Sequence, residues 1–210
     1  RTTADIDVTI AVQDAHEFRQ VSLGDPAGGP FKRVVDGLSL DVVPCGGIET
    51  DGVLMHDDTR LTVLGCAEAA RHADTLRLPN GAVLPFASLE SLAVLKLIAF
   101  SERYPATDKD SVDLEAILAA AGEGRNGEET WGDEEALQAM EYDHLTASVY
   151  RLGRVAISCF TSERAGLVLD FAAQAREHLL TAWRGRSREQ LDAWLAGLSA
   201  EATGLRSAPT

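Results

Sequence analysis

The chain has 210 residues, 45% of them hydrophobic and 25% charged, which is the composition of a folded protein with a substantial core and excludes a disordered chain. Its formal net charge of −14 argues against a broadly basic surface for nucleic acids, although a local basic groove is compatible with it. No apolar run approaches the roughly 18 to 20 residues of a membrane span, and Cys45, Cys66 and Cys159 lack the spacing of a disulfide framework or a zinc site, so we expect a cytoplasmic protein without a membrane partner.

The first 86 residues predict short strands joined by loops. Asp36-Gly37 and Asn80-Gly81 each lie between apolar or alternating runs, which is the strongest short-range signal for a β-hairpin. The pattern favours a small mixed β-sheet with flanking helices. The expected strands are residues 5–12, 33–35, 38–44, 60–65, 74–78 and 82–86, and the expected helical pieces are residues 13–20 and 66–73.

Helical periodicity begins after residue 87. Ser88 is suited to cap a buried helix that runs to about Arg103. The acidic, glycine-containing stretch 122–129 predicts a loop or linker. We therefore expect an α+β chain with a core domain built on the mixed sheet at residues 1–122 and an all-helical domain at residues 131–205. The helices expected beyond the linker are residues 133–140, 143–158, 163–183 and 187–199.

Asp5 and Asp7 stand one residue apart in the first predicted strand, although aspartate is depleted in strands. Residues i and i+2 of a strand point to the same face, so the two carboxylates would lie side by side, roughly 6 to 7 Å apart along the chain. Like charges this close repel unless a cation lies between them, and Mg2+ prefers oxygen ligands. The pair therefore indicates a site for a divalent cation.

A third aspartate, Asp41, interrupts LSLDVVP, which otherwise predicts a buried strand where an unpaired carboxylate is costly. If this strand pairs beside the first, Asp41 joins Asp5 and Asp7 in an acidic cluster. Such a cluster can hold one or two metal ions and support in-line displacement at phosphorus. Taken singly, each aspartate is equally compatible with a turn cap, an exposed strand edge or a bulge.

Lys96 lies on the apolar face of the helix that follows Ser88, with no carboxylate three or four residues away. A buried ammonium group needs an anion, and phosphate oxygens suit lysine. The alternative is a lysine that reaches the surface past its neighbours. Farther along, Asp110 and Asp113 fall in the first turn of a predicted helix, where the helix dipole alone accounts for them.

Four stretches, taken in order, resemble the nucleotidyltransferase superfamily of the DNA polymerase beta type. More narrowly, they are similar to its AbiEii/AbiGii branch, the toxins of type IV toxin–antitoxin and abortive-infection systems. The similarity runs from Arg1 to about residue 120 and continues weakly at YRLGR, residues 150–154. The four stretches are TADIDV at residues 3–8, LDVVPCGGIE at 40–49, ASL at 87–89 leading to LKL at 95–97, and KDSVDL at 109–114.

The resemblance implies an enzyme dependent on Mg2+ or Mn2+ that transfers a nucleotidyl group from a nucleoside triphosphate to an acceptor hydroxyl and releases pyrophosphate. It assigns the metals to Asp5 and Asp7 and makes Asp41 the third carboxylate, which activates the attacking hydroxyl. It also brings Lys96 to the triphosphate.

The family's downstream Lys-Asp-x-x-Asp element is matched by residues 109–113. This match assigns a catalytic role to Asp113 and nucleotide binding to Lys109 and Asp110. The superfamily also grips phosphates with a Gly-Ser turn upstream of the aspartate pair, a position that precedes Arg1. We expect that element outside these 210 residues or in a degenerate form.

The branch resemblance further implies tRNA as the acceptor and a cognate antitoxin as a partner. Two alternatives stay open: transfer to a small molecule or protein, and a catalytically degenerate, antitoxin-like binding module. The C-terminal half is rich in arginines that could form a groove for tRNA or merely solvate amphipathic helices. They are Arg151, Arg154, Arg164, Arg176, Arg184, Arg186 and Arg188.

Overall fold

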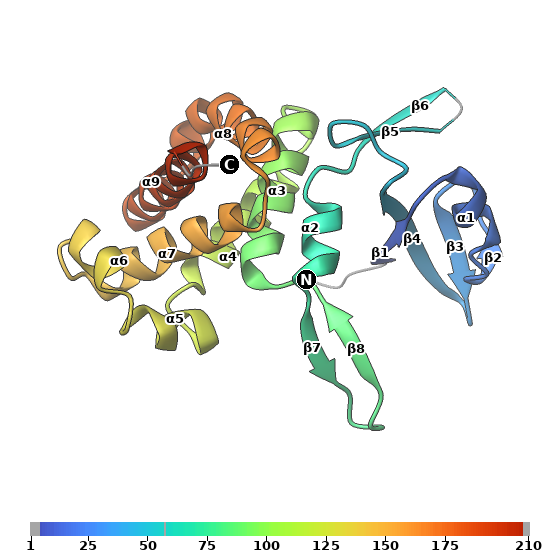
Figure 1. Ribbon diagram of the computed structural model, residues 1–210, viewed down its shortest axis with the longest axis horizontal. Helices are drawn as coiled ribbons and strands as arrows, with labels where there is room; N and C mark the ends of the chain where they lie inside the picture. Colours follow the sequence, from blue (N-terminus) through green and yellow to red (C-terminus); the bar gives the residue numbers. More distant parts are fainter. Residues whose placement is uncertain (1–4, 57, 208–210) are drawn as a thin grey trace. The chain divides into compact units, whose positions relative to one another are not determined.

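The computed structural model describes residues 5–56 and 58–207 and divides into two compact units, Arg1–Phe86 and Ala87–Thr210 (Figure 1). The first unit holds small sheets with two short helices, and the second is built from helices. The expected α+β class with a helical C-terminal region is therefore confirmed. The division lies 36 residues before the predicted boundary at residue 122, because α3 (Leu89–Arg103) and α4 (Lys109–Ala119) pack against later helices.

The first unit contains a four-stranded sheet in the order β1-β4-β3-β2 and two hairpins, β5-β6 and β7-β8. All six expected strands and both helical pieces are present, with ends shifted by up to three residues. The sequence analysis missed β2, which has only two residues, and β5, which lacks polar alternation. The elements are β1 (Asp5–Val12), α1 (Ala15–Gln20), β2 (Asp25–Pro26), β3 (Lys32–Val35), β4 (Leu38–Gly46), β5 (Val53–His56), β6 (Thr59–Thr62), α2 (Cys66–Arg71), β7 (Asp74–Arg77) and β8 (Val83–Phe86).

The turn at Asp36-Gly37 sets the register between β3 and β4. Both residues have positive φ, 49° and 81°, as a type I′ turn requires. The turn pairs Val35 with Leu38 and, farther along the hairpin, Lys32 with Asp41. The predicted Asp-Gly hairpin is confirmed, and so is the Asn80-Gly81 hairpin between β7 and β8.

One face of the four-stranded sheet carries the apolar core of the first unit. Val12, Leu40 and Val42 are buried there together with Phe18 of α1. Side chains alternate between the two faces of a strand, so the odd-numbered residues of β1 and β4 lie on the opposite face. That opposite face carries Asp7.

The second unit begins with α3, which is capped as predicted: the Ser88 hydroxyl accepts a hydrogen bond from the Ser91 backbone N–H at 3.3 Å. Its remaining helices surround a core of buried leucines, alanines and Trp194. No helix within residues 5–56 and 58–207 has both the length and the apolar character to cross a membrane. The later helices are α5 (Gly124–Thr130), α6 (Glu134–Ala139), α7 (His144–Ser158), α8 (Ser162–Ala182) and α9 (Arg186–Ser207).

The predicted loop at residues 122–129 is wrong, because most of it forms α5. The buried side chain of Asn126 donates hydrogen bonds to the carbonyl oxygens of Ala121 at 2.6 Å and Ser148 at 2.9 Å. The Thr130 hydroxyl in turn donates to the Asn126 carbonyl at 2.7 Å. Contacts with α7 thus stabilise a short glycine-containing helix whose local sequence favours a loop.

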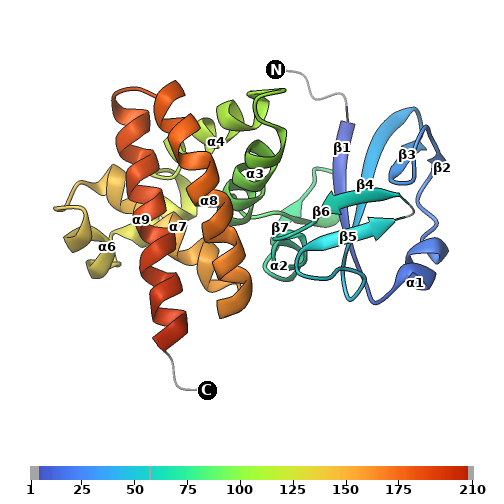
Figure 2. The ribbon, with the colours of Figure 1, turned by 90° about the horizontal axis from the view of Figure 1, so that it is seen from above.

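Two glycines allow α7 and α9 to approach closely, and the two helices lie side by side (Figure 2). A Cβ atom at Gly197 would collide with the Tyr150 carbonyl oxygen, and one at Gly153 would collide with the Trp194 carbonyl oxygen. Because the obstructing atoms belong to the backbone of the neighbouring helix, a rotamer change could not relieve either collision. The two helix backbones would have to move apart.

Gly197→Ala is therefore expected to destabilise the second unit by about 1–3 kcal/mol, since overpacking outweighs the gain in helix propensity. Gly204→Ala is the matched control, because it lies on the same helix with open space around its Cα. It should instead stabilise α9 by about 0.5–1 kcal/mol. Urea unfolding followed by circular dichroism measures both changes, and equal signs for the two variants would contradict the close helix approach.

Candidate functional site

Asp7 and Asp41 lie directly opposite each other on neighbouring parallel strands. The register of β1 and β4 pairs Asp7 with Asp41 and Val8 with Val42. Paired residues of adjacent strands share a face, and neighbouring strands lie about 4.7–4.9 Å apart, so the two carboxylates project from one face at short range. Asp7 is exposed and Asp41 is half-buried. The structure therefore brings together two of the three predicted metal-binding aspartates.

Asp5 is the first described residue of β1, and its backbone pairs with Ser39. The side chain of Asp5 lies outside the described atoms. Among the described side chains, no group of three or more His, Cys, Asp or Glu is placed to hold a metal ion. The described part of the predicted trio is thus the pair Asp7 and Asp41.

Lys32 of β3 completes a row of charges across the sheet. Its Nζ lies 2.7 Å from Oδ1 of Asp41, its partner across the hairpin. The side chains are 50% and 27% exposed, so the ion pair is accessible to solvent. The row runs from Asp7 through Asp41 to Lys32, and Lys32 forms an ion pair with Asp41.

The far end of the same face is covered by α2. Thr9, two residues beyond Asp7, forms a side-chain hydrogen bond with Cys66 of α2. Burial, followed by the nearby Cys45 and Glu49, raises the pKa of the Cys66 thiol to about 12. The thiol is therefore protonated and unreactive at neutral pH. The end of the face that carries Asp7 and Asp41 remains open.

Two adjacent carboxylates on neighbouring strands fit a hard divalent ion such as Mg2+. The donors are oxygens on neighbouring strands, and a dication between them would relieve their mutual repulsion. Lys32 competes for Asp41, but a half-exposed lysine can swing into solvent at little cost. Asp7 and Asp41 are the described residues that would hold such an ion.

The remaining predicted site residues lie in the second unit, where α3 faces α4. Lys96 Nζ lies 2.7 Å from Oδ2 of Asp113 and 3.1 Å from Oδ1 of Asp110. Arg103, seven residues or about two helical turns after Lys96, donates from Nη1 to Oδ2 of Asp110 at 3.1 Å. Lys109 at the start of α4 is exposed. The structure thus supplies the anions that Lys96 needs from the matched Lys-Asp-x-x-Asp element.

The Asp110 side chain is 2% exposed, whereas Asp113 and Lys96 are each 28% exposed. Burial alone would lower the pKa of Lys96, but the hydrogen bonds that Lys96 donates to Asp113 and Asp110 outweigh it, and the pKa is raised. Lys96 is therefore charged at neutral pH. Its two carboxylate partners belong to the same unit, whereas Asp7 and Asp41 belong to the other.

Two participants in these clusters, Lys32 and Arg103, were not predicted. In a hairpin with a two-residue turn, a residue that lies n positions before the turn pairs with the residue n positions after it. Lys32 lies four positions before Asp36-Gly37 and Asp41 four positions after, so the turn already implies that the two residues pair. On α3, Lys96 and Arg103 stand seven residues apart and share one face. Two cations on one helix face indicate that a neighbouring helix carries acidic residues, as Asp110 and Asp113 of α4 do.

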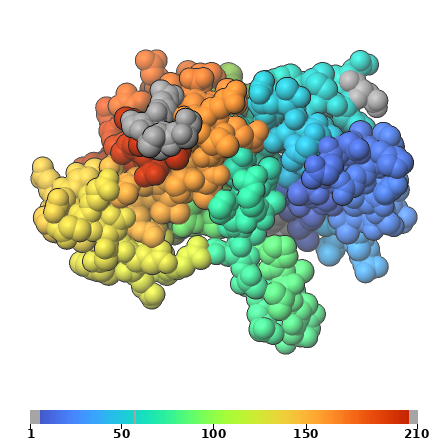
Figure 3. Space-filling view, viewed as in Figure 1, coloured from blue at the N-terminus to red at the C-terminus, as the bar shows by residue number. Residues whose placement is uncertain are grey.

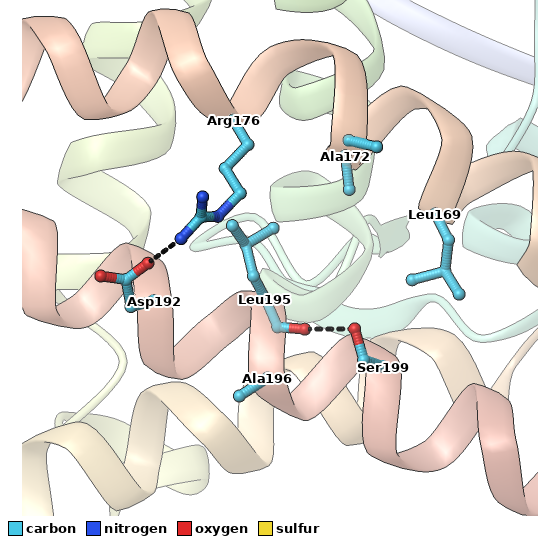
Figure 4. A pocket seen from close by; sticks show the side chains of 8 residues that line it. Leu169, Ala172, Arg176, Asp192, Leu195, Ala196 and Ser199 are labelled. Atoms are coloured by element: carbon cyan, nitrogen blue, oxygen red, sulfur yellow. Dashed lines mark hydrogen bonds and ion pairs between the residues drawn. The ribbon is translucent and has the colours of Figure 1, made fainter.

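A separate pocket of about 380 Å³ lies between α8 and α9 (Figure 4). Its floor is apolar, and at one end Arg176 donates to Asp192 at 3.1 Å. None of the predicted catalytic, nucleotide-binding or metal-binding residues lines it, and Arg176 is the one lining residue among the arginines considered for a tRNA groove. Its lining residues are Leu169, Ala172, Ala173, Arg176, Asp192, Leu195, Ala196 and Ser199.

Comparison of the chain with known protein families, with curated proteins and with solved structures finds no match.

Proposed function

We propose that the chain is a metal-dependent nucleotidyltransferase, and the observation that carries this proposal is the placement of Asp7 opposite Asp41 on an open face of the sheet. Two like charges held at neighbouring register positions cost free energy unless a cation joins them. The sequence resemblance supplies the reaction: a nucleoside triphosphate is attacked at its α-phosphorus by an acceptor hydroxyl. A new bond forms between the acceptor oxygen and the α-phosphorus. The bond between the α-phosphorus and the oxygen that bridges it to the β-phosphorus breaks, and pyrophosphate leaves.

In this proposal Asp7 and Asp41, together with Asp5, hold Mg2+ or Mn2+, which when bound would offset the charge on the phosphate oxygens and the leaving group. Asp41 accepts the proton of the attacking hydroxyl, because it is the half-buried member of the pair. Lys32 lies beside it, with Nζ 2.7 Å from Oδ1 of Asp41. Lys96 is assigned to the triphosphate by resemblance alone.

The resemblance also proposes tRNA as the acceptor, and the arginines bear on this point. Arg151 pairs with Glu129 and Asp133, Arg154 with Asp133, Glu135 and Glu201, and Arg176 with Asp192. Arginines already neutralised by carboxylates attract a polyanion weakly. We therefore rank a small or cationic acceptor beside tRNA.

A second candidate is a binding module without catalysis, and the neutralisation of Lys96 inside its own unit favours it. Lys96 has two carboxylate partners in place, so its burial needs no phosphate. In this case the Lys96 cluster is a structural link between α3 and α4. The acidic face of the first unit would then bind a cation without turning over a nucleotide.

One assay separates the two candidates. The full chain is incubated with each nucleoside triphosphate labelled at the α-phosphate, with Mg2+, Mn2+ or EDTA, and with total RNA or a metabolite extract. A transferase transfers label only with metal, and Asp7→Ala abolishes the transfer. Label transfer that survives Asp7→Ala would reject the proposed site. Metal binding without label transfer would favour the binding module.

The Lys32–Asp41 pair predicts a measurable competition. Lys32→Gln is expected to bind Mn2+ about two- to fivefold more tightly than the wild-type chain, because the ion no longer displaces an ammonium group from Asp41. Titration calorimetry measures the change. Arg19→Gln, which removes an exposed cation from α1, is the control with the same change in net charge. Identical shifts for both variants would show that only net charge matters.

A further inference from the structure

Trp131 is the most exposed large hydrophobic residue of the described chain, with 68% of its surface accessible. It is the residue directly after α5. The segment that contains α5 is yellow in Figure 3. Its ring stacks on the imidazole of His144, with centroids 4.1 Å apart and planes inclined by 19°. His144 is itself held by a hydrogen bond between Nε2 and the Gly127 carbonyl at 2.9 Å. One face of the indole is therefore fixed against a supported ring, and the other is open.

This arrangement is costly for a surface residue without a partner. The other two tryptophans, Trp183 and Trp194, are 4% and 0% exposed. An exposed indole forgoes the free energy of apolar burial, and aromatic rings held rigidly at a surface typically serve as contact points for partners. The stacking on His144 also removes the entropic cost of ordering the ring on binding.

The charge around Trp131 selects the kind of partner. Five carboxylates stand within four residues of it, in the sequence EETWGDEE at residues 128–135. Three are compensated from α7: Glu129 and Asp133 by Arg151, and Glu135 by Arg154. The nearest on the same helical face is Glu128, three residues before Trp131 and exposed.

Glu134 is engaged differently, as it accepts hydrogen bonds from Tyr142 and Gln138 at 2.7 Å. The hydrogen bond from Tyr142, and to a smaller extent the one from Gln138, lowers the pKa of Glu134 and keeps its carboxylate ionised. Tyr142 is 61% exposed and adds a second aromatic ring to the same segment. The open face of Trp131 thus lies in a region of net negative charge that repels phosphate.

We propose that Trp131 and Glu128 form a docking site for an arginine side chain in a basic segment of a partner protein. The planar guanidinium stacks on the open indole face, where cation–π attraction is strongest for tryptophan, and donates hydrogen bonds to the Glu128 carboxylate. A nucleic acid offers a stacking base but brings phosphates into the acidic surroundings. The acidic segment therefore favours a basic peptide over RNA.

The test uses a labelled arginine–glycine peptide as the probe and a citrulline–glycine peptide of equal length as the uncharged control. Anisotropy measures affinity at physiological ionic strength, and tryptophan emission reports Trp131 directly because the other two tryptophans are buried. We expect Trp131→Ala to weaken arginine-peptide binding about fivefold and to abolish the emission change, with Trp131→Phe retaining part of both. We expect Glu128→Gln to weaken binding about two- to threefold.

Glu177→Gln is the matched control, since it removes one exposed carboxylate from α8. Binding unchanged by Trp131→Ala, or weakened equally by Glu177→Gln and Glu128→Gln, would mean nonspecific attraction to an acidic protein and would overturn the proposal. Tighter binding of a single-stranded oligonucleotide than of the peptide would overturn it in favour of nucleic acid. Circular dichroism of each variant confirms that the fold is retained.

Discussion

Asp41→Asn and Asp7→Asn are each expected to reduce nucleotidyl transfer by about 10²–10³-fold while leaving the first unit folded. Each substitution removes one ionised oxygen donor from the acidic pair and keeps the side-chain volume. It also removes the repulsion between two carboxylates at paired register positions, so the free energy of unfolding should stay the same or rise. Loss of activity without loss of stability distinguishes a functional pair from a structural one.

The matched control for these variants is Asp25→Asn on β2, an exposed aspartate of the same sheet that pairs with Val34, away from β1. It should retain full transfer. Label incorporation and urea unfolding are measured on the same preparations of all three variants. If Asp7→Asn and Asp41→Asn lower stability by more than about 1 kcal/mol and leave transfer intact, the two carboxylates are structural.

Much of the first unit follows from local sequence, because its register depends on short turns. Asp36-Gly37 adopts the positive φ angles of a type I′ turn and pairs Lys32 with Asp41. The parallel pairing of β1 with β4 is not local, yet the isolated aspartates already suggested it, since each alone is costly in a strand. The structure places Asp7 and Asp41 opposite each other, as that reasoning requires.

The failures arise where contacts distant in sequence decide the structure. The stretch 122–129 has the glycines of a loop, and a buried Asn126 bonded to α7, 22 residues away, makes it helical. Lys96 has no carboxylate three or four residues away on its own helix, but it pairs with two on α4, 14 and 17 residues away. Spacings of three and four residues identify neighbours on the same helix and give no information on partners from another helix. The two carboxylates of α4 supply anions for Lys96, and its contact with a triphosphate stays a prediction.

Asp110→Ala is expected to destabilise the second unit by about 3–5 kcal/mol, the usual cost of removing one partner from a buried ion-pair network. The Asp110 carboxylate is 2% exposed and accepts from both Lys96 and Arg103 at 3.1 Å. Its loss removes a carboxylate partner from both Lys96 and Arg103, and the half-buried Asp113 still pairs with Lys96. Asp113→Ala, at 28% exposure, should cost about 1 kcal/mol.

The same network predicts the response to alkaline pH. The pKa of Lys96 is raised in the folded state, so its contribution to stability is complete below the ordinary lysine pKa of roughly 10.4 and is lost as pH rises through the higher folded value. Lys96→Met should lose this component of the alkaline destabilisation while remaining folded at neutral pH, where Arg103 still pairs with Asp110. Urea unfolding at neutral pH and near pH 11 measures the difference. An unchanged alkaline response in Lys96→Met, or equal costs for Asp110→Ala and Asp113→Ala, would show that the buried carboxylate does not hold α3 to α4.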